Sequence, residues 1–270
     1  MSGQPPSSLL RVVLLIASGI AHHLASTIST EADKVQETDE NGLDHTKQHD
    51  KHPSAVRPFL LCLKLSKYIF WTFITIEGTC RILQSLPSTR FSRAALSKLL
   101  PTGAFHQGDY SQLPFLLSSI SIIAGWGIRR ACFATLGRHF TFTHTTLNKH
   151  SLITTGPYSV VRHPGYVGMA LIRLGGVCLI LSPGSWVRVI GAVPWPLCRL
   201  LSVSLESSSG SLLNGSKILV GMYIAHAILE QYALLGVRAR REDETLYREF
   251  GDEWISYSTK VPWMFLPYVI

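Results

Sequence analysis

Two polar blocks, each beside an apolar stretch, hold the residues whose types and spacing suggest chemistry. The first block runs from His150 to Tyr166 and ends in Arg-His-Pro-Gly-Tyr. Its Gly-Pro pair predicts a reversal of the chain, and Pro164 predicts the first turn of a helix, where the missing proline N–H costs nothing. The free amides of such a helix start, with His163 beside them, attract anions. The block therefore indicates either an anion-binding site or a capped, basic membrane boundary.

The second block, residues 238–262, begins with a highly charged sequence that predicts an amphipathic helix from Arg238 to Phe250. Arg238 and Glu242 are four residues apart and share one face of that helix. As a surface ion pair they would contribute less than about 0.5 kcal/mol. Because they come immediately after an apolar segment, they also fit a second interpretation, a charged pair at the bilayer surface that meets a substrate carried in the lipid.

The composition indicates an integral membrane protein. Of the 270 residues, 46% are hydrophobic and 16% are charged, with a mean hydropathy of +0.22, whereas soluble domains carry about 25% charged residues. The net charge of +8 fits loops beside an anionic membrane surface, so membrane lipid is an expected partner. No basic run is interleaved with aromatic residues, and nucleic-acid binding is therefore not expected.

Apolar stretches predict an all-α membrane fold with about five transmembrane helices, five or six in all. The stretches cover residues 9–28, 58–79, 113–128, 165–181 and 217–236. The first stretch carries Arg11 and is N-terminal, so a cleaved signal peptide is the alternative to the preferred retained anchor. Arg173 lies within the fourth stretch, where a cation is costly and suggests a function.

The stretches divide the chain into four regions. An anchor (1–28) precedes a polar linker (29–57) that lacks apolar periodicity and should be poorly ordered. Residues 58–128 hold spans two and three, and residues 129–270 hold spans four and five with both polar blocks. The positive-inside rule places both blocks in the cytoplasm. The basic connector 80–112 and the Ser-rich connection 185–216 are then lumenal, the latter with a glycosylation acceptor at Asn214.

No metal site is expected. His45, His49 and His52 lie near acidic residues, but no rigid element holds their spacing, and a solvated loop is preferred over a metal site. The five cysteines are odd in number, far apart and without CxxC spacing, which argues against zinc and against a disulfide framework.

Taken together, the two blocks resemble the isoprenylcysteine carboxyl methyltransferase family, integral membrane enzymes that methylate the C-terminal carboxylate of prenylated proteins. The resemblance covers about the last half of the chain. The first block has a family-like stretch over residues 150–153, a turn ending in Tyr158, and the sequence RHPxY. The second matches the family signature through Glu242, Leu246, Phe250, Gly251, Trp254, Tyr257, Val261 and Pro262.

This resemblance implies S-adenosylmethionine as the cofactor and the prenylated C-terminal cysteine of CaaX-type proteins as the substrate. It implies a multi-pass protein of the endoplasmic reticulum membrane whose active site, in residues 129–270, faces the cytoplasm. The implied cofactor-binding residues are His150, Ser151, Leu152, Ile153, Tyr158, His163, Pro164, Gly165, Tyr166 and Glu242. Arg238 is implied as the catalytic residue that binds the substrate carboxylate. The implied reaction is direct displacement, which needs no general base because a carboxylate is already ionised at neutral pH.

Other functions remain open on the sequence. A membrane phospholipid N-methyltransferase would need no arginine for a carboxylate, and RHPxY also occurs in membrane sterol reductases. A non-catalytic scaffold or receptor is a third alternative, against which the intact cofactor block argues. Two features depart from the family pattern. The connection 185–216 is long, and residues 143–149 offer only His144 as an upstream cofactor contact. The resemblance also leaves Arg173 without a role.

Overall fold

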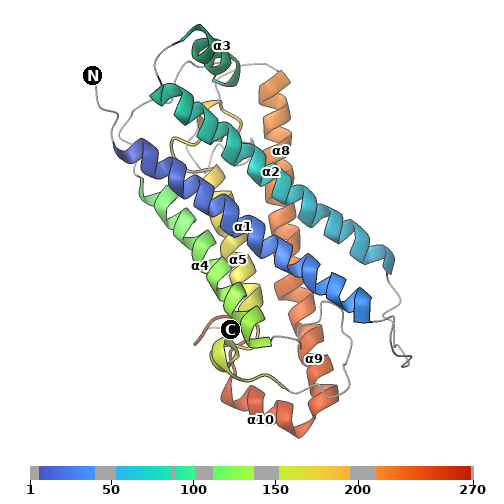
Figure 1. Ribbon diagram of the computed structural model, residues 1–270. Helices are drawn as coiled ribbons and strands as arrows, with labels where there is room; N and C mark the ends of the chain where they lie inside the picture. Colours follow the sequence, from blue (N-terminus) through green and yellow to red (C-terminus); the bar gives the residue numbers. More distant parts are fainter. Residues whose placement is uncertain are drawn as a thin grey trace. The chain divides into compact units, whose positions relative to one another are not determined.

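The computed structural model describes residues 6–39, 53–86, 89–100, 112–136, 152–194 and 211–268. Within these ranges the regular structure is helical and contains no strand (Figure 1). The long helices are α1 (Pro6–Asp39), α2 (Pro53–Ser85), α4 (Leu113–Leu136), α5 (Pro164–Ile180) and α8 (Ser211–Gln231). Each predicted apolar stretch coincides with or overlaps one of these helices, which confirms the all-helical prediction.

Shorter helical elements connect and follow the long ones. They are α3 (Arg90–Leu99), the 3-10 helix η2 (Gly156–Ser159), α6 (Trp186–Val189), the π-helix η3 (Tyr232–Arg238), α9 (Ala239–Phe250) and α10 (Asp252–Lys260). Asn214, the predicted glycosylation acceptor, lies in the first turns of α8. The histidine-containing centre of the predicted linker lies outside the described residues, whereas α1 and α2 extend into its two ends.

Two described segments are long and apolar enough to cross a membrane. They are Leu9–Thr27, with 19 residues, and Leu213–Phe250, with 38 residues, while Pro164–Ile180 is a shorter apolar helix. Large aliphatic side chains lie exposed on these helices, among them Ile218 at 63% and Leu229 at 67%. Surfaces of this kind suit contact with lipid, where every backbone group must be hydrogen-bonded within its own helix.

The helices fall into two compact units. Unit 1 comprises Met1–His22, Leu65–Ile123 and Arg173–Ala227, and unit 2 comprises His23–Lys64, Ala124–Ile172 and Ile228–Ile270. Both polar blocks belong to unit 2.

Arg173 is buried in unit 1, with 1% of its surface exposed. Its Nη1 lies 2.8 Å from Nε2 of His22, and the Tyr223 hydroxyl lies 3.3 Å from the same nitrogen. The His22 ring stacks on Phe70 with centroids 4.3 Å apart. Because a guanidinium can only donate, Nε2 of His22 accepts, and a neutral His22 carries its proton on Nδ1. Arg173 therefore pairs inside the unit instead of extending to a membrane surface.

Glycines allow α4 and α5 to approach closely in unit 2. A Cβ atom added to Gly125 would lie 2.5 Å from the carbonyl oxygen of Gly168, and one added to Gly168 would lie 2.8 Å from the carbonyl oxygen of Gly125. Small residues are enriched at such contacts in membranes, where close backbone packing drives helix association.

Gly125→Val will destabilise the protein, because its branched side chain cannot fit against the α5 backbone. Overpacking of this kind costs about 1–3 kcal/mol. The matched control is Gly127→Val on the same helix, where an added Cβ meets no atom within 4 Å. Thermal denaturation of the solubilised full chain should show a lower Tm for Gly125→Val alone, and equal Tm values would contradict this packing.

Candidate active site in unit 2

The first block forms a tight turn that leads into α5. Gly156 adopts a φ of 60°, and a Cβ atom at this position would lie 2.9 Å from Oγ1 of Thr135. Glycine is needed here both for the left-handed conformation and for the close approach. The helix α5 then begins at Pro164, as the sequence predicted, so that His163 immediately precedes its first turn.

The second block is a helical segment with one irregularity. The predicted amphipathic helix corresponds to α9, which the π-helix η3 precedes and which ends before Gly251, with a φ of 50°. Arg238 is the last residue of η3. Short π-helical segments are rare and frequent at functional sites. Arg238 therefore ends a segment whose hydrogen-bond register differs from that of an α-helix, and Glu242 lies in the α-helical turn that follows.

Tyr166 joins the two blocks. Its hydroxyl donates a hydrogen bond of 2.6 Å to Oε2 of Glu242, and it also shares a hydrogen bond with the Arg238 side chain. Since the guanidinium can only donate, the tyrosine oxygen accepts from Arg238 while its proton goes to Glu242. The side chain of Glu242 remains 38% exposed. The structure therefore brings together three of the predicted residues, with a carboxylate and a guanidinium both in contact with one hydroxyl.

A second contact between the blocks uses Asp243, which the sequence analysis did not single out. Oδ1 of Asp243 lies 2.7 Å from Nε2 of His163, and its Oδ2 lies 3.4 Å from Nη2 of Arg162. Nδ1 of His163 faces Oε2 of Glu242 at 3.8 Å. Adjacent acidic residues on α9 thus engage adjacent basic residues before α5. Its position beside Glu242 is the one sequence signal that could have identified Asp243.

The C-terminal segment closes over the start of α5. The backbone N–H groups of Arg162 and His163 donate to the carbonyl oxygens of Trp263 and Met264, at 2.9 and 3.0 Å. The ring of Phe265 lies 6.0 Å from the His163 ring, centroid to centroid. These contacts bury the His163 side chain to 4% exposure, which holds its ring in one place.

Most residues of the second signature form a supporting core. Trp254, Tyr257 and Val261 are buried together, and Leu152, Leu246 and Phe250 pack against them. The Tyr257 hydroxyl donates to the carbonyl oxygen of Tyr158 at 2.7 Å. This core and the Tyr257 hydrogen bond therefore hold the turn of the first block against α10.

Burial keeps Tyr257 and the neighbouring Tyr158 protonated at neutral pH. Burial raises the pKa of Tyr257 to about 12, a rise that Arg162 opposes and Asp243 assists. Burial also raises the pKa of Tyr158, whose hydroxyl donates to the thiol of Cys132. Both hydroxyls therefore act as hydrogen-bond donors at neutral pH, and neither can serve as a base.

The remaining predicted residues have the following positions. His150 and Ser151, like the upstream candidate His144, lie outside the described residues. Ile153 is half-buried in the segment before η2. The carbonyl oxygen of Gly165 accepts a hydrogen bond of 3.3 Å from Nη1 of Arg129, a buried cation.

The fold and site define a helical membrane protein with a charged site where two polar blocks meet. Residues 117–206 match the isoprenylcysteine carboxyl methyltransferase (ICMT) family. The protein-S-isoprenylcysteine O-methyltransferase A of Arabidopsis thaliana is 37% identical over 149 residues, which cover 50% of this chain and 72% of that protein. The chain therefore belongs to the isoprenylcysteine carboxyl methyltransferase family, which confirms the resemblance inferred from the two blocks.

Two further relatives match over smaller shares of their length. The protein-S-isoprenylcysteine O-methyltransferase of Xenopus laevis is 26% identical over 160 residues, 57% of this chain and 42% of that protein. A probable protein-S-isoprenylcysteine O-methyltransferase of Oryza sativa subsp. indica is 36% identical over 72 residues, 25% of this chain and 37% of that protein. The chain thus spans less than half the length of these two relatives. No solved structure matches.

Asp243→Asn will loosen the contact between the blocks, because it removes the charge that holds Arg162 and His163. The expected loss is about 1–3 kcal/mol in the free energy of unfolding. Glu244→Gln is the matched control, since Glu244 is exposed on the same helix and should change stability by less than about 0.5 kcal/mol. Equal changes in the free energy of unfolding for the two variants, measured by denaturant titration, would show that the Asp243 contact does not stabilise the protein.

Above pH 10 the protein will lose stability that depends on Tyr257. A pKa raised in the folded state favours the protonated form, so this contribution is complete below the ordinary pKa near 10 and disappears as the pH rises towards about 12. The size should be on the order of 2 kcal/mol. Tyr257→Phe should reduce the difference in Tm between pH 9 and pH 11. An unchanged difference would contradict the burial of this hydroxyl.

Proposed function

We propose that this protein methylates the C-terminal carboxylate of prenylated cysteine, as found in CaaX-type proteins, with S-adenosylmethionine as methyl donor. The observation that carries the proposal is the placement of Glu242 and Arg238 around the Tyr166 hydroxyl, in a chain whose relatives are named protein-S-isoprenylcysteine O-methyltransferases. A single site thus offers a carboxylate for a cationic ligand and a guanidinium for an anionic one.

The residues of the site fit both reactants. S-adenosylmethionine supplies a methyl group that can pass to a carboxylate oxygen as its bond to sulfur breaks, with no proton transferred. The partly exposed Glu242 carboxylate suits the positive charge of such a donor, and Arg238 can hold the substrate carboxylate by charge-assisted hydrogen bonds. We assign Arg238 as the catalytic, substrate-binding residue. The proposed cofactor-binding residues are His150, Ser151, Leu152, Ile153, Tyr158, His163, Pro164, Gly165, Tyr166 and Glu242.

The proposed role of the protein is alignment. His163 and Tyr166 are stacked, with ring centroids 5.5 Å apart, and both are held by carboxylates of α9. Such fixed partners keep Glu242 in one orientation and so reduce the entropy that must be lost when two substrates meet. The substrate carboxylate is already ionised at neutral pH, so the protonated state of the nearby tyrosines is compatible with the reaction.

We further propose a multi-pass protein of the endoplasmic reticulum membrane, with α1, α2, α4, α5 and α8 as its five spans. The basic residues that flank the third and fourth spans and follow the fifth support a cytoplasmic site. A cysteine introduced at Ser208, in the predicted lumenal connection, should react with an impermeant reagent only from the lumenal side. Reaction from the cytoplasm alone would overturn this orientation.

The function is tested by incubating membranes that contain the full chain with labelled S-adenosylmethionine and a farnesylcysteine or geranylgeranylcysteine analogue. We expect label in a base-labile methyl ester of the analogue. Label in the headgroup amine of phospholipid would instead identify a phospholipid methyltransferase. Absence of transfer to the prenylcysteine, with methyl-donor binding intact, would refute the proposed substrate.

Arg238→Lys should lower turnover although the positive charge is kept, because lysine cannot present the planar guanidinium fork. Loss of one charge-assisted contact in the transition state costs about 1.5–3 kcal/mol, roughly ten- to a hundredfold in rate. The affinity for S-adenosylmethionine should stay unchanged. Arg241→Lys, at an exposed position of the same helix, is the matched control and should retain full turnover.

Glu242→Gln should give the opposite result, a weaker affinity for S-adenosylmethionine, since the carboxylate charge is lost while the shape is kept. His163→Ala should likewise weaken cofactor binding while the protein still inserts into membranes. Isothermal titration of the detergent-solubilised chain measures both. Full turnover of a prenylcysteine by both Arg238→Lys and Glu242→Gln would show that this helix is not part of the active site.

A further inference from the structure

The charges of the two units differ sharply. In the described residues of unit 1, nine lysines and arginines accompany a single carboxylate, that of Glu77. The described residues of unit 2 hold eleven basic and eleven acidic residues. The described part of unit 1 therefore has a strong excess of positive charge, which an anionic partner would complement.

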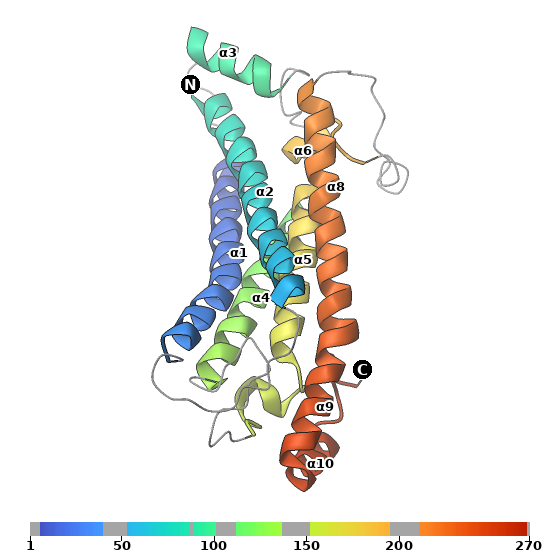
Figure 2. The ribbon, with the colours of Figure 1, turned by 90° about the vertical axis from the view of Figure 1, so that its right-hand side faces the viewer.

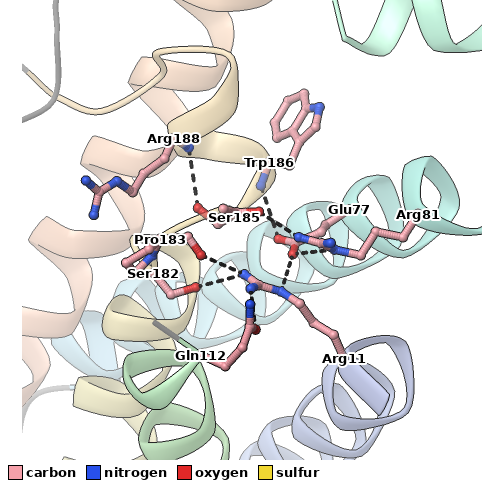
Figure 3. Close-up of polar contacts among 10 residues, drawn as sticks. Arg11, Glu77, Arg81, Gln112, Ser182, Pro183, Ser185, Trp186 and Arg188 are labelled. Atoms are coloured by element: carbon pink, nitrogen blue, oxygen red, sulfur yellow. Dashed lines mark hydrogen bonds and ion pairs between the residues drawn. The ribbon is translucent and has the colours of Figure 1, made fainter. Parts of the chain in front are cut away.

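The one carboxylate in the described part of unit 1 is engaged in the interior of that unit (Figure 3). Glu77 is 5% exposed, and its Oε1 accepts from Nε of Arg11 at 3.2 Å and from Nε of Arg81 at 3.0 Å. Its Oε2 accepts from the backbone N–H of Trp186 at 3.2 Å. Glu77 therefore cannot neutralise cations on the surface of the unit.

The same network holds the end of α3. The indole N–H of Trp186 donates to the carbonyl oxygen of Leu99, the last residue of α3, at 2.8 Å. Nη2 of Arg81 donates to the carbonyl oxygen of Gly184 at 2.6 Å, two residues before Trp186, the first residue of α6. In Figure 2, α3 lies across the end of α2. This short helix is thus a fixed part of unit 1.

The outward face of α3 is basic. Arg90, Arg93 and Lys98 are exposed, while Ser92 is buried and Leu99 is half-buried on the opposite side. No acidic residue occurs between Thr89 and Leu100. We call Arg90, Arg93 and Lys98 the α3 basic face.

Apolar side chains lie exposed beside these cations. Phe91 is 78% exposed. Ile82, in the last turn of α2, is 48% exposed, and Leu86, which directly follows α2, is 54% exposed. A helix that combines cations with exposed apolar side chains suits the boundary between headgroups and acyl chains, where the apolar groups enter the bilayer. An acidic protein would satisfy the cations but would not account for this apolar surface at the end of a long apolar helix.

We propose that the α3 basic face binds the headgroups of anionic phospholipids. Phe91 and Leu86 enter the acyl-chain boundary, and Arg90, Arg93 and Lys98 meet the phosphates. The buried Glu77 network keeps α3 in place for this contact. The inference concerns unit 1 and is independent of the methyl-transfer proposal, which rests on unit 2.

The test measures phospholipid binding by the full chain in mixed detergent micelles. The probes are fluorescent phosphatidylglycerol and phosphatidylcholine with the same acyl chains. We expect the chain to prefer phosphatidylglycerol. The triple variant Arg90→Gln/Arg93→Gln/Lys98→Gln should bind it on the order of a hundredfold more weakly, because each cation near an anionic surface contributes about fivefold to the affinity. Raising the salt should weaken wild-type binding.

The matched control is Arg240→Gln/Arg241→Gln/Arg248→Gln, three exposed cations on α9 that lie among carboxylates. This variant should keep the preference for phosphatidylglycerol. Equal losses in both triple variants would mean that net charge alone attracts the lipid and would overturn the proposal. Unchanged binding of phosphatidylglycerol by the α3 variant would also overturn the proposal.

Discussion

The hydrogen bond between Tyr166 and Glu242 is the contact on which the organisation of unit 2 depends. At 2.6 Å it joins the first turn of α5 to the first turn of α9, across 76 residues of sequence. A hydrogen bond to a charged group is roughly twice as strong as a neutral one. The adjacent contact of His163 with Asp243, at 2.7 Å, repeats the connection one residue further along α9. Two successive residues of one helix thereby hold the residues that begin another.

Several local features direct these side chains towards one another. Pro164 begins α5 and leaves His163 at its open N-terminal end. The π-helix before α9 places Arg238 at its end, and Gly251 turns the chain into α10. The core around Trp254 then holds the first block through the Tyr257 hydroxyl. Charged residues at a membrane protein's helix ends thus acquire a defined geometry from an apolar support.

The long helices were predictable because a membrane requires backbone groups to be satisfied locally, so apolar composition alone indicates where they lie. The start of α5 was also predictable, since proline suits the first turn of a helix. The π-helix was not, because no local pattern distinguishes it from the α-helix around it. The partnership of Asp243 with His163 and the pairing of Trp263 with Arg162 join residues about 80 to 100 positions apart. Such contacts depend on how the helices pack.

The interior of unit 1 shows the same limit. No local pattern in the sequence indicates that two arginines and a backbone N–H share the carboxylate of Glu77. Buried charges are stable only when they are paired and hydrogen-bonded. The sequence showed where such charges occur, and the structure shows which partners make them tolerable.

The central claim, that the two blocks form one site through Tyr166 and Glu242, is tested most directly by a double-mutant cycle. The free energy of unfolding of the full chain would be measured for wild type, Tyr166→Phe, Glu242→Gln and the double variant. A direct hydrogen bond to a carboxylate predicts a coupling energy of about 1–3 kcal/mol. A coupling energy near zero would show that the two side chains do not interact and would contradict the account.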